Sequence, residues 1–309
     1  MKISVCIPAY KNAAFLRRNL EALVSQTFKD FEVIISDDSP DNSVADLLGD
    51  YARRLTIVYL KNSPAKGSPA NWNLAISQAR GEYLKLLHDD DWLATDTALQ
   101  QYLSCLTDNP GIDFCFSAFN NVNLGSGSIE PVSCSKYHQH LLKKSPYNLF
   151  KRNFIGPPSV VFQRNLGGQF YDEQLKWLVD FEGYIRFLRT NQRFIYLNER
   201  LVNIGLSGEQ VTSYTQHDAT VVLPESLYFL EKHGAAILDN VFVYDYFWRM
   251  LRNFSVRSAA DLAKAGWTAA LPARIVNMIK FQQKISPALL NLGPCSKLLM
   301  LMSRSLRLT

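Results

Sequence analysis

Residues 83–92 read Tyr-Leu-Lys-Leu-Leu-His-Asp-Asp-Asp-Trp, an apolar run of strand length that ends in a histidine, three consecutive aspartates and a tryptophan. Three adjacent carboxylates repel one another, and keeping them charged inside a protein would be costly. At the C-terminal end of a strand such a cluster can instead hold a divalent cation, because Mg²⁺ and Mn²⁺ prefer carboxylate oxygens. A solvated acidic turn explains the same residues, since acidic turns are common. Motifs elsewhere in the chain are needed to distinguish these two interpretations.

Strand-like runs alternate with helix-like segments up to this stretch. The expected strands lie at residues 3–7, 32–36, 56–60 and 83–87, and the expected helices lie at 12–24, with Asn12 as N-cap, 44–52 and 70–79. Such alternation is typical of a mostly parallel sheet covered by helices on both faces. Right-handed crossovers place the strand C-termini along one edge, where ligands of such sheets bind. We therefore expect Pro8-Ala9-Tyr10, Asp37-Asp38 and residues 88–91 to meet there.

The second part of the chain carries fewer strand signals. Further helices are expected at residues 96–106 and from about Asp180, and further strands at 112–118, 129–134, 159–162 and 193–197. Asp180 stands at a helix start, where an acid complements the helix dipole. From about residue 215 onward the apolar spacing indicates helices only.

Composition limits the class of protein. The hydrophobic content of 47% is sufficient for a folded core. The five cysteines are scattered and lack a CxxC pair, which favours a reducing compartment over a disulfide framework or a zinc site. Met1 leads directly into a strand-like run and no apolar run could span a bilayer, so we expect neither a signal peptide nor a transmembrane helix. These observations predict a cytoplasmic protein.

The net charge of +5 is unevenly distributed. Residues 262–309 contain seven basic residues and no acidic one, so the rest of the chain is slightly acidic. Near the C-terminus Lys297, Arg304 and Arg307 interleave with leucines and methionines, a composition that suits an anionic membrane surface. An ordinary helix packed on the rest of the protein explains the same residues. Nucleic acid is not an expected partner, because no nucleic-acid-binding module is recognisable.

In their order and spacing, the motifs resemble those of glycosyltransferase family 2. They are Pro-Ala-Tyr after the first strand, Asp-Asp-Ser after the second, Asn62 with Gly67 and Asn73, the acids before Trp92, and a later helix that carries acids. The resemblance covers roughly residues 1–212. It implies the GT-A fold, an α/β fold with a mostly parallel sheet, a nucleotide-diphosphate sugar as donor, and inversion at the anomeric carbon. We predict a catalytic domain at residues 1–214, with a nucleotide-sugar half at 1–92 and an acceptor half at 93–214, followed by a helical region at 215–309.

The resemblance also implies which residues bind the nucleotide sugar. They are Pro8, Ala9, Tyr10, Asp38, Lys66, Asn73, Asp89 and Asp90. The first three would line the nucleobase pocket, and Asp38 would hydrogen-bond the base or the ribose. Asn73 matches the asparagine of the family's Ala-Arg-Asn signature, but Trp72 stands at the arginine position. Lys66 or Lys61 would then supply the missing positive charge.

His88-Asp89-Asp90 covers the family's Asp-x-Asp position. The resemblance implies Asp90 as a ligand of a divalent cation, Mn²⁺ or Mg²⁺, with Asp89 facing the metal or the ribose. His88 stands where the first acid of the motif is often found. Two roles stay open for His88: a metal ligand through an imidazole nitrogen, or a packing partner of Leu87 and Trp92.

The family's catalytic Glu-Asp pair precedes an aromatic helix that ends in arginine. A register anchored on Arg186 places this pair at Val179-Asp180. Asp180 is therefore the predicted general base, and Glu182 is the second candidate. Near residue 205 many members carry an arginine and a histidine separated by one residue, where this chain has Gly205 and Ser207.

These assignments predict an inverting, metal-dependent hexosyl- or N-acetylhexosaminyltransferase that uses a UDP- or dTDP-sugar. By analogy with the family, the acceptor would be a glycan or lipid-linked glycan of a bacterial surface polysaccharide or glycolipid. The basic tail would add a peripheral contact with the inner face of the cell membrane. The alternative is a nucleotide-sugar-binding module without catalysis, because Val179, Gly205 and Ser207 depart from the family pattern. A nucleotidyltransferase is disfavoured, since residues 8–11 do not form a glycine-rich loop.

Overall fold

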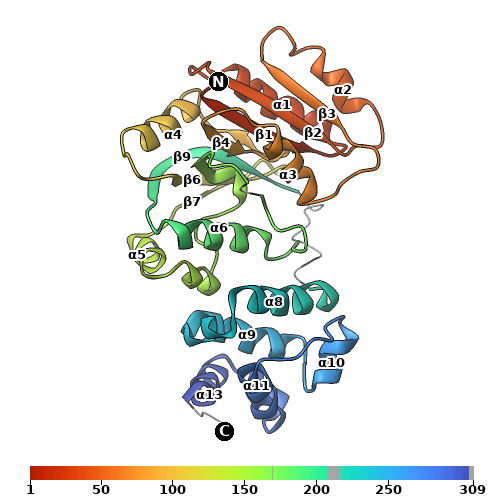
Figure 1. Cartoon of the computed structure of the whole chain (residues 1–309), viewed down its shortest axis with the longest axis vertical. Helices are drawn as coiled ribbons and strands as arrows, with labels where there is room; N and C mark the ends of the chain where they lie inside the picture. Colours follow the sequence, from red (N-terminus) through yellow and green to blue (C-terminus); the bar gives the residue numbers. More distant parts are fainter. Residues whose placement is uncertain (169, 208–214, 216, 306–309) are drawn as a thin grey trace. The chain divides into compact units, whose positions relative to one another are not determined.

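The computed structural model describes residues 1–168, 170–207, 215 and 217–305. The chain divides into two compact units, which Figure 1 shows together. The sheet unit consists of Met1–Lys143, Phe154–Glu173 and Val179–Gln210, and the helical unit consists of Lys144–Asn153, Gln174–Leu178 and Val211–Thr309. The domain boundary expected between residues 214 and 215 involves position 214, which lies outside the described residues.

One mixed sheet forms the centre of the sheet unit. Its strands are β1 Ile3–Ala9, β2 Phe31–Asp37, β3 Ile57–Lys61, β4 Tyr83–Leu86, β5 Trp92–Leu93, β6 Phe114–Asn123, β7 Ile129–Val132, β8 Val161–Arg164 and β9 Ile195–Leu206. Their order is β3-β2-β1-β4-β8-β6-β9-β5, with β7 paired to β6. The strands from β3 to β4 are parallel, as are β6 and β9, whereas β8, β7 and β5 pair antiparallel with their neighbours. The predicted α/β fold is confirmed.

Helices flank this sheet (Figure 1). They are α1 Ala13–Val24, α2 Ser43–Leu48, α3 Ala70–Ser77, α4 Ala98–Thr107, α5 Lys136–Lys144 and α6 Val179–Thr190. The N-cap predicted for α1 is confirmed, because the Asn12 side chain accepts the N–H of Phe15 at 3.3 Å. Leu16, Leu20 and Leu23 are buried at helical spacing, which fixes the face of α1 that meets the sheet.

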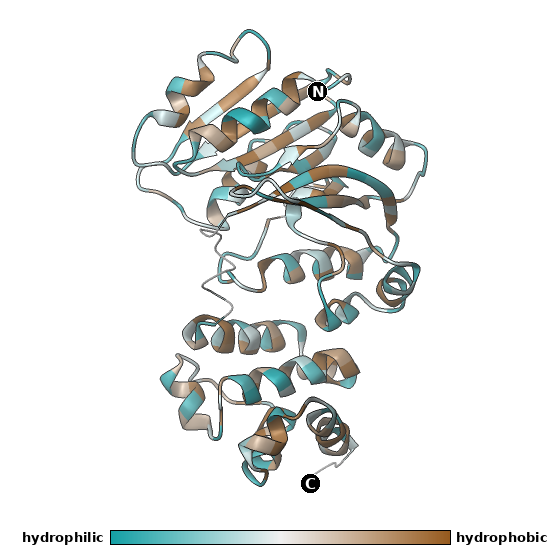
Figure 2. Ribbon diagram, turned by 180° about the vertical axis from the view of Figure 1, so that it is seen from behind, coloured by the Kyte–Doolittle hydropathy of each residue, from teal (hydrophilic) through white to brown (hydrophobic). Residues whose placement is uncertain are grey.

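The core of the sheet unit lies along the parallel strands. Every residue of β1 and β2 is buried, as expected for strands covered on both faces. In Figure 2, which colours the ribbon by hydropathy, brown hydrophobic stretches run along strands of the sheet, and the flanking helices carry both brown and teal residues. Burying one Val, Leu or Ile side chain contributes about 1.5–3 kcal/mol to folding. These strands therefore form a rigid base for the loops at their C-terminal ends.

Several strands differ from the sequence prediction. β6, expected at residues 112–118, continues to Asn123, and β8, expected at 159–162, lies at Val161–Arg164 after a short 3-10 helix, η2 Pro158–Val160. β9, expected at residues 193–197, continues to Leu206, because a bulge between Leu197 and Arg200 interrupts the apolar pattern without ending the pairing with β6. β5 was not predicted, since its two residues, Trp92 and Leu93, are too few to give a pattern; they pair with β9. The acid cluster is thus followed directly by a return into the sheet.

The regular elements described in the helical unit are all helices, as predicted. They are η1 Pro146–Lys151, α8 Ala219–His233, η3 Ala235–Asp239, α9 Val241–Asn253, α10 Ala259–Lys264, α11 Ala273–Gln283, α12 Pro287–Asn291 and α13 Gly293–Ser305. Trp248 of α9 is a central residue of this unit, and its indole donates to Ser296 Oγ at 3.0 Å. Among the described residues, no helix is both long and apolar enough to cross a bilayer.

Candidate active site

The polar segments expected at one sheet edge do meet there. Ala9 and Asp37 are paired at the ends of β1 and β2, and the N–H of Asp38 donates to the carbonyl of Ala9 at 3.0 Å. The N–H of Tyr10 donates to Asp89 Oδ2 at 2.9 Å. The turn after β1 therefore contacts both the turn after β2 and the acids after β4.

A cleft of about 340 Å³ lies at this edge. Tyr10, Lys11, Asp38, Lys61 and Asn62 are among the residues that line it. The Tyr10 side chain is 53% exposed, so its ring is accessible to a ligand. Pro8 and Ala9, the other two residues of the expected nucleobase pocket, are buried at the end of β1.

The carboxylate of Asp38 holds the loop that closes one side of the cleft. Its Oδ1 accepts Asn62 Nδ2 at 2.8 Å and the N–H of Lys66 at 2.9 Å, and its Oδ2 accepts the N–H of Gly67 at 2.7 Å. Gly67 has φ +74°, a conformation that favours glycine. Asp38 thus orders the loop, and the exposed side chain of Lys66 extends from it.

Lys61, the other candidate for the missing positive charge, is already paired. Its ammonium donates to Asp37 Oδ2 at 3.0 Å and to the carbonyl of Ser39 at 2.7 Å. Burial alone would raise the pKa of Asp37, but hydrogen bonds from Ser39, Lys61 and Tyr59 lower that pKa below its ordinary value. The charge of Lys61 therefore compensates the buried Asp37.

Residues 88–91, which we call the acid turn, are held by α1 and by the segment before β8. The Asn19 side chain donates to the carbonyls of His88 at 2.9 Å and Asp91 at 2.8 Å. Ser159 Oγ accepts the N–H of His88 at 3.0 Å. Neither contact was predicted, although a buried asparagine within the leucine stripe of α1 is a recognisable signal.

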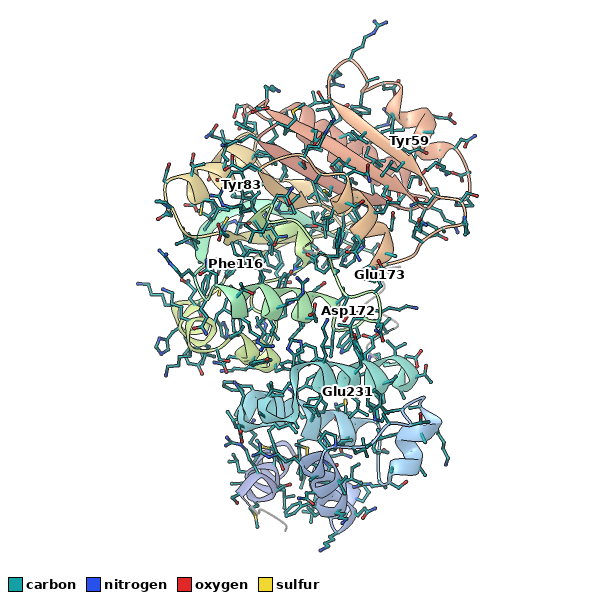
Figure 3. All side chains as sticks on the ribbon, viewed as in Figure 1. Tyr59, Tyr83, Phe116, Asp172, Glu173 and Glu231 are labelled. Atoms are coloured by element: carbon teal, nitrogen blue, oxygen red, sulfur yellow. The ribbon has the colours of Figure 1, made fainter. Side chains whose placement is uncertain are left out.

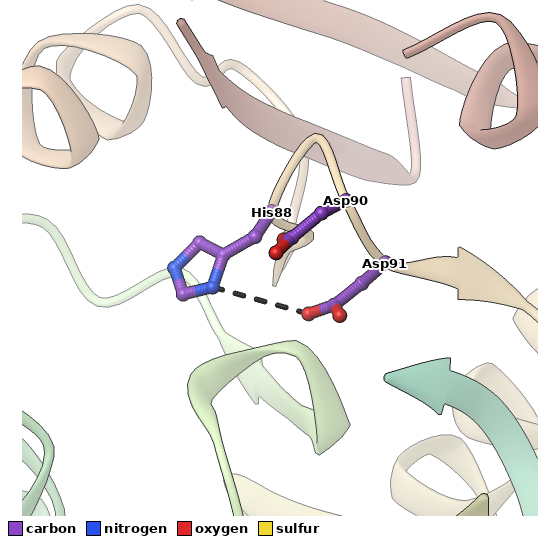
Figure 4. Close-up of side chains that lie close together, drawn as sticks. All are labelled: His88, Asp90 and Asp91. Carbon is purple, nitrogen blue, oxygen red and sulfur yellow. Dashed lines mark ion pairs between the residues drawn. The ribbon is translucent and has the colours of Figure 1, made fainter. Parts of the chain in front are cut away.

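The acid turn brings together one histidine and two aspartates (Figure 4). One ligand atom from each of His88, Asp90 and Asp91 lies within 4.8 Å of the others. His88 Nδ1 is 3.9 Å from Asp91 Oδ2, and Asp91 Oδ1 accepts the N–H of Gly205 at 3.0 Å. Asp89, implied as a metal ligand beside Asp90, instead accepts the N–H of Tyr10. The structure therefore groups His88, for which a metal-ligand role was left open, with Asp90, and it adds Asp91 as a candidate donor.

The electrostatics of the acid turn fit a bound cation. Burial and the neighbouring charge of Asp90 raise the pKa of Asp89 to about 7, and burial raises the pKa of Asp90 to about 6. Burial lowers the pKa of His88 to about 4, so its imidazole is neutral at pH 7 and retains a lone pair for a metal. These carboxylates are held close together against repulsion that a divalent cation would relieve.

Asp180, the predicted base, lies in the first turn of α6, in the same unit as the acid turn. Burial raises its pKa to about 7, and its charge acts on the pKa values of Tyr171 and Tyr184. The Trp72 ring lies 5.2 Å from the Tyr171 ring and 4.7 Å from the His88 ring, centroid to centroid. Successive ring contacts from His88 to Trp72 and from Trp72 to Tyr171 therefore connect the acid turn with the surroundings of Asp180.

Three other predicted positions have specific neighbours. Glu182 is fully buried and its Oε2 lies 3.3 Å from Arg186 Nε. The amide of Asn73 bonds to Tyr171 and Glu173 rather than standing open to a ligand. At Gly205 a Cβ atom would lie 2.3 Å from the carbonyl oxygen of Asp90, so an arginine does not fit there. Ser207, the other departure from the family pattern, directly follows β9.

Lys85 is a buried charged neighbour of the acid turn that sequence reasoning overlooked. It is fully buried in β4, and its ammonium donates to the carbonyls of Ser159 and Val161. Burial lowers the pKa of Lys85 to about 7, while Cys115 and Asp91 act in the opposite direction. A lysine inside an apolar strand run was the available signal. Lys85 and the acid turn share Ser159 as a partner, since Ser159 Oγ accepts the N–H of His88, and the charge of Lys85 interacts favourably with Asp91.

Comparisons with known proteins agree with this geometry. A sequence model described as glycosyl transferase family 2 matches residues 4–162. An uncharacterized glycosyltransferase of Methanocaldococcus jannaschii is 28% identical over 204 residues, which cover 65% of this chain and 69% of the relative. A poly(ribitol-phosphate) beta-glucosyltransferase of Bacillus spizizenii is 34% identical over 106 residues, which cover 33% of this chain and only 17% of that enzyme.

Solved structures show the same fold. The crystal structure of S. aureus TarS in complex with UDP matches with a TM-score of 0.62 and 18% identity, covering 97% of this chain and 89% of that chain. At this identity the likeness concerns the arrangement of the backbone.

Proposed function

The chain belongs to glycosyl transferase family 2 and has the GT-A fold, and on this premise we propose that it is an inverting transferase of a single sugar. The reaction breaks the bond between the anomeric carbon and the diphosphate oxygen and forms a bond to an acceptor hydroxyl oxygen. It releases a nucleoside diphosphate and one proton. One observation carries this proposal: the sheet unit contains both the acid turn, which lies beside a cleft, and Asp180, whose pKa is raised. The rings of Trp72 and Tyr171 lie between His88 of the acid turn and the surroundings of Asp180.

On the donor side, we propose that the nucleobase of a UDP- or dTDP-sugar occupies the cleft beside Tyr10. Pro8, Ala9 and Asp38 would shape that pocket from the strand ends and the loop. The side chain of Lys66 would approach the diphosphate, because it is the exposed cation of that loop. The structure of TarS with UDP supports a uridine nucleotide.

Asp90 is the central residue of the proposed metal site. Asp91 and His88 offer the neighbouring donor atoms, which suit Mn²⁺ or Mg²⁺. Asp89, the second predicted ligand, holds the turn after β1 by accepting the N–H of Tyr10. Such a cation, when bound, neutralises charge on the departing diphosphate. The N–H of Gly205 and the side chain of Asn19 keep the acid turn in one conformation while this charge develops.

On the acceptor side, Asp180 would take the proton from the attacking hydroxyl. A carboxylate with a pKa near 7 is well matched to this task at neutral pH. Attack from the side opposite the leaving group inverts the anomeric carbon without a covalent intermediate. Glu182 is less suited, because it is fully buried beside Arg186.

The sugar and the acceptor are proposed by class only. We propose a hexosyl or N-acetylhexosaminyl donor and a glycan or lipid-linked acceptor in bacterial surface polysaccharide or glycolipid assembly. The Bacillus relative, a poly(ribitol-phosphate) beta-glucosyltransferase by name, supports transfer of a hexose to a polymer. A nucleotide-sugar-binding module without catalysis is the second candidate, favoured by the lack of space for a side chain at Gly205.

Thermal shift tests the donor assignment. We expect UDP-sugars to raise the melting temperature in the presence of Mn²⁺, because a ligand that binds only the folded state stabilises it. Asp90→Ala should remove most of the Mn²⁺-dependent part of the shift and leave the metal-free part unchanged. Asp96→Ala, at a position beyond the turn, is the control. Equal shifts with and without Mn²⁺ in the wild type would contradict the metal site.

We further propose that the protein is cytoplasmic and that α13 contacts an anionic membrane surface. Its inward face packs on α9, where Tyr244 and Ser303 hydroxyls lie 2.8 Å apart. On its outward face, Leu298, Leu301 and Met302 have exposed fractions of 64%, 44% and 54%. The predicted tail residues Leu306, Arg307 and Leu308 lie outside the described residues. Exposed apolar side chains within an acid-free basic region suit such a surface.

Vesicle flotation tests the membrane contact. The full chain should float with phosphatidylglycerol vesicles and much less with phosphatidylcholine vesicles. Replacing Leu298, Leu301 and Met302 with serine should abolish flotation, because the insertable apolar surface is lost. Ile129→Ser, which removes a similarly exposed side chain from β7, serves as the control. Unchanged flotation of the triple variant would reject α13 as the contact.

A further inference from the structure

Asn73 joins two segments of the sheet unit that lie far apart in the sequence. Its Oδ1 accepts the N–H of Tyr171 at 2.7 Å, and its Nδ2 donates to the carbonyl of Tyr171 at 2.8 Å and to Glu173 Oε1 at 3.0 Å. An amide that pairs with both backbone groups of one residue fixes its position and orientation. Figure 3 shows Glu173 beside α3, where this contact is made.

The Tyr171 ring is held between α3 and α6. On one side the Trp72 ring meets it edge to face, at 86°. On the other side, a Cβ atom at Gly183 would lie 2.9 Å from Tyr171 Cε1, so only glycine lets the ring come this close to the helix. Gly183 follows Asp180 by three residues, which places both on one face of α6. The ring therefore covers the helix face that carries Asp180.

A second bond ties this segment to α6. Arg186 donates through Nη2 to the carbonyl of Phe170 at 2.6 Å, and its Nε faces Glu182. Residues 170–173 are thus fixed from α3 by Asn73 and from α6 by Arg186.

The groups around Asp180 can be identified from their electrostatic interactions. Its charge acts on the phenols of Tyr171, in the preceding segment, and Tyr184, on α6. The guanidinium of Arg186, also on α6, acts on Tyr171 in the opposite direction. The raised pKa of Asp180 follows from burial of its carboxyl group.

We propose that Asn73 and Tyr171 are positioning residues for Asp180. The amide of Asn73 fixes Tyr171, and the Tyr171 ring keeps water from Asp180 and limits the orientations of its carboxyl group. This inference rests on the proposed role of Asp180 as the base. It gives Asn73 a different task from the nucleotide contact that the family resemblance implies.

The test measures turnover, nucleotide affinity and the pH profile in parallel. Release of UDP is followed with Mn²⁺ and the UDP-sugar that gives the largest thermal shift, and UDP affinity is measured by calorimetry. Asn73→Ala and Tyr171→Leu should lower kcat about 10- to 100-fold, since small misplacements of a reacting group are costly. Both should change UDP affinity less than about twofold. The acid limb of the kcat/KM profile should shift from about 7 toward an ordinary carboxyl pKa, because water then reaches Asp180.

Two matched variants separate the ring from other effects. Tyr171→Phe keeps the ring and the backbone bonds, so it should retain activity and the acid limb. Ser77→Ala, on the exposed side of α3, should also behave as wild type. If the alanine variant fails to fold, Asn73→Asp supplies the comparison, because it keeps the acceptor and loses the donor.

The outcomes distinguish this inference from the proposed function. An acid limb that stays near 7 in the folded Asn73 and Tyr171→Leu variants would overturn the inference, whatever their kcat. A tenfold loss of UDP affinity with unchanged kcat in Asn73→Ala would also overturn it, in favour of nucleotide contact. Near-normal turnover of Asp180→Asn would instead reject the base assignment itself.

Discussion

Asp180→Asn should stop sugar transfer, lowering turnover by about 10²–10⁴-fold or more, while UDP affinity stays within about twofold. The amide has the shape of the carboxyl group and cannot accept a proton from the acceptor hydroxyl. Asp180 is not among the residues that line the cleft beside Tyr10, so the nucleotide contacts there should persist. Turnover with the best UDP-sugar and calorimetry with UDP and Mn²⁺ measure the two effects.

The pH dependence of this variant gives an independent check. The wild-type kcat/KM should rise with pH through about 7, because only the ionised form of Asp180 accepts the proton. Asp180→Asn should lose this limb. Glu199→Gln, which removes an exposed acid of β9, should keep both the activity and the limb. A retained limb in Asp180→Asn would assign the titration to another group.

The same substitution should stabilise the fold at high pH. A carboxyl group whose pKa is raised from 3.8 to about 7 on folding destabilises the native state increasingly as pH rises between these values. Asp180→Asn should therefore melt at a higher temperature than the wild type above pH 7. The difference should vanish below about pH 4, where the carboxyl group is protonated in both states. A higher melting temperature together with a lower turnover in Asp180→Asn would show that Asp180 serves the reaction and not the stability of the fold.

Gly205→Ala should have the second large effect, on both stability and metal-dependent nucleotide binding. A Cβ atom there would lie 2.3 Å from the Asp90 carbonyl oxygen and 3.2 Å from Leu124 Cδ1. Because the first neighbour is backbone, the acid turn must move away from β9, at a cost of about 1–3 kcal/mol. That movement would lengthen the bond from the Gly205 N–H to Asp91 and displace Asp90.

Thermal melting and the Mn²⁺-dependent shift with UDP measure this prediction. Gly49→Ala is the control, because its nearest contact would be 3.5 Å from the Asp46 carbonyl and its backbone is helical. We expect the control to melt at or above the wild-type temperature. A Gly205→Ala protein with wild-type melting and an unchanged Mn²⁺ effect would show that β9 does not fix the acid turn.

The sequence predicted those parts of the structure that local patterns determine. Asn12 caps α1 because its side chain needs only the backbone three residues ahead. The strands before Tyr10 and Asp38 followed from short apolar runs, and their common edge followed from the handedness of crossovers. Family resemblance pointed to Asp180, whose surroundings could not be inferred from its neighbours in the chain.

Most of the contacts that sequence reasoning missed join distant segments. Asn19 reaches the acid turn across 69 and 72 positions, and Asn73 reaches Tyr171 across 98. The grouping of Asp91 with His88 depends on the turn conformation and on Gly205, 114 positions away from Asp91. No period of 2 or 3.6 residues encodes such pairings, because they depend on which surfaces the sheet brings together.

The way in which the acid turn is held has a consequence for the thermodynamics of catalysis. Asn19, Ser159 and Gly205 bind it from three separate elements, so its backbone is ordered before a ligand arrives. The entropy of arranging these carboxylates is thus lost during folding and not at each encounter. Preorganisation of this kind lets the electrostatic stabilisation of the leaving group appear in full in the transition state.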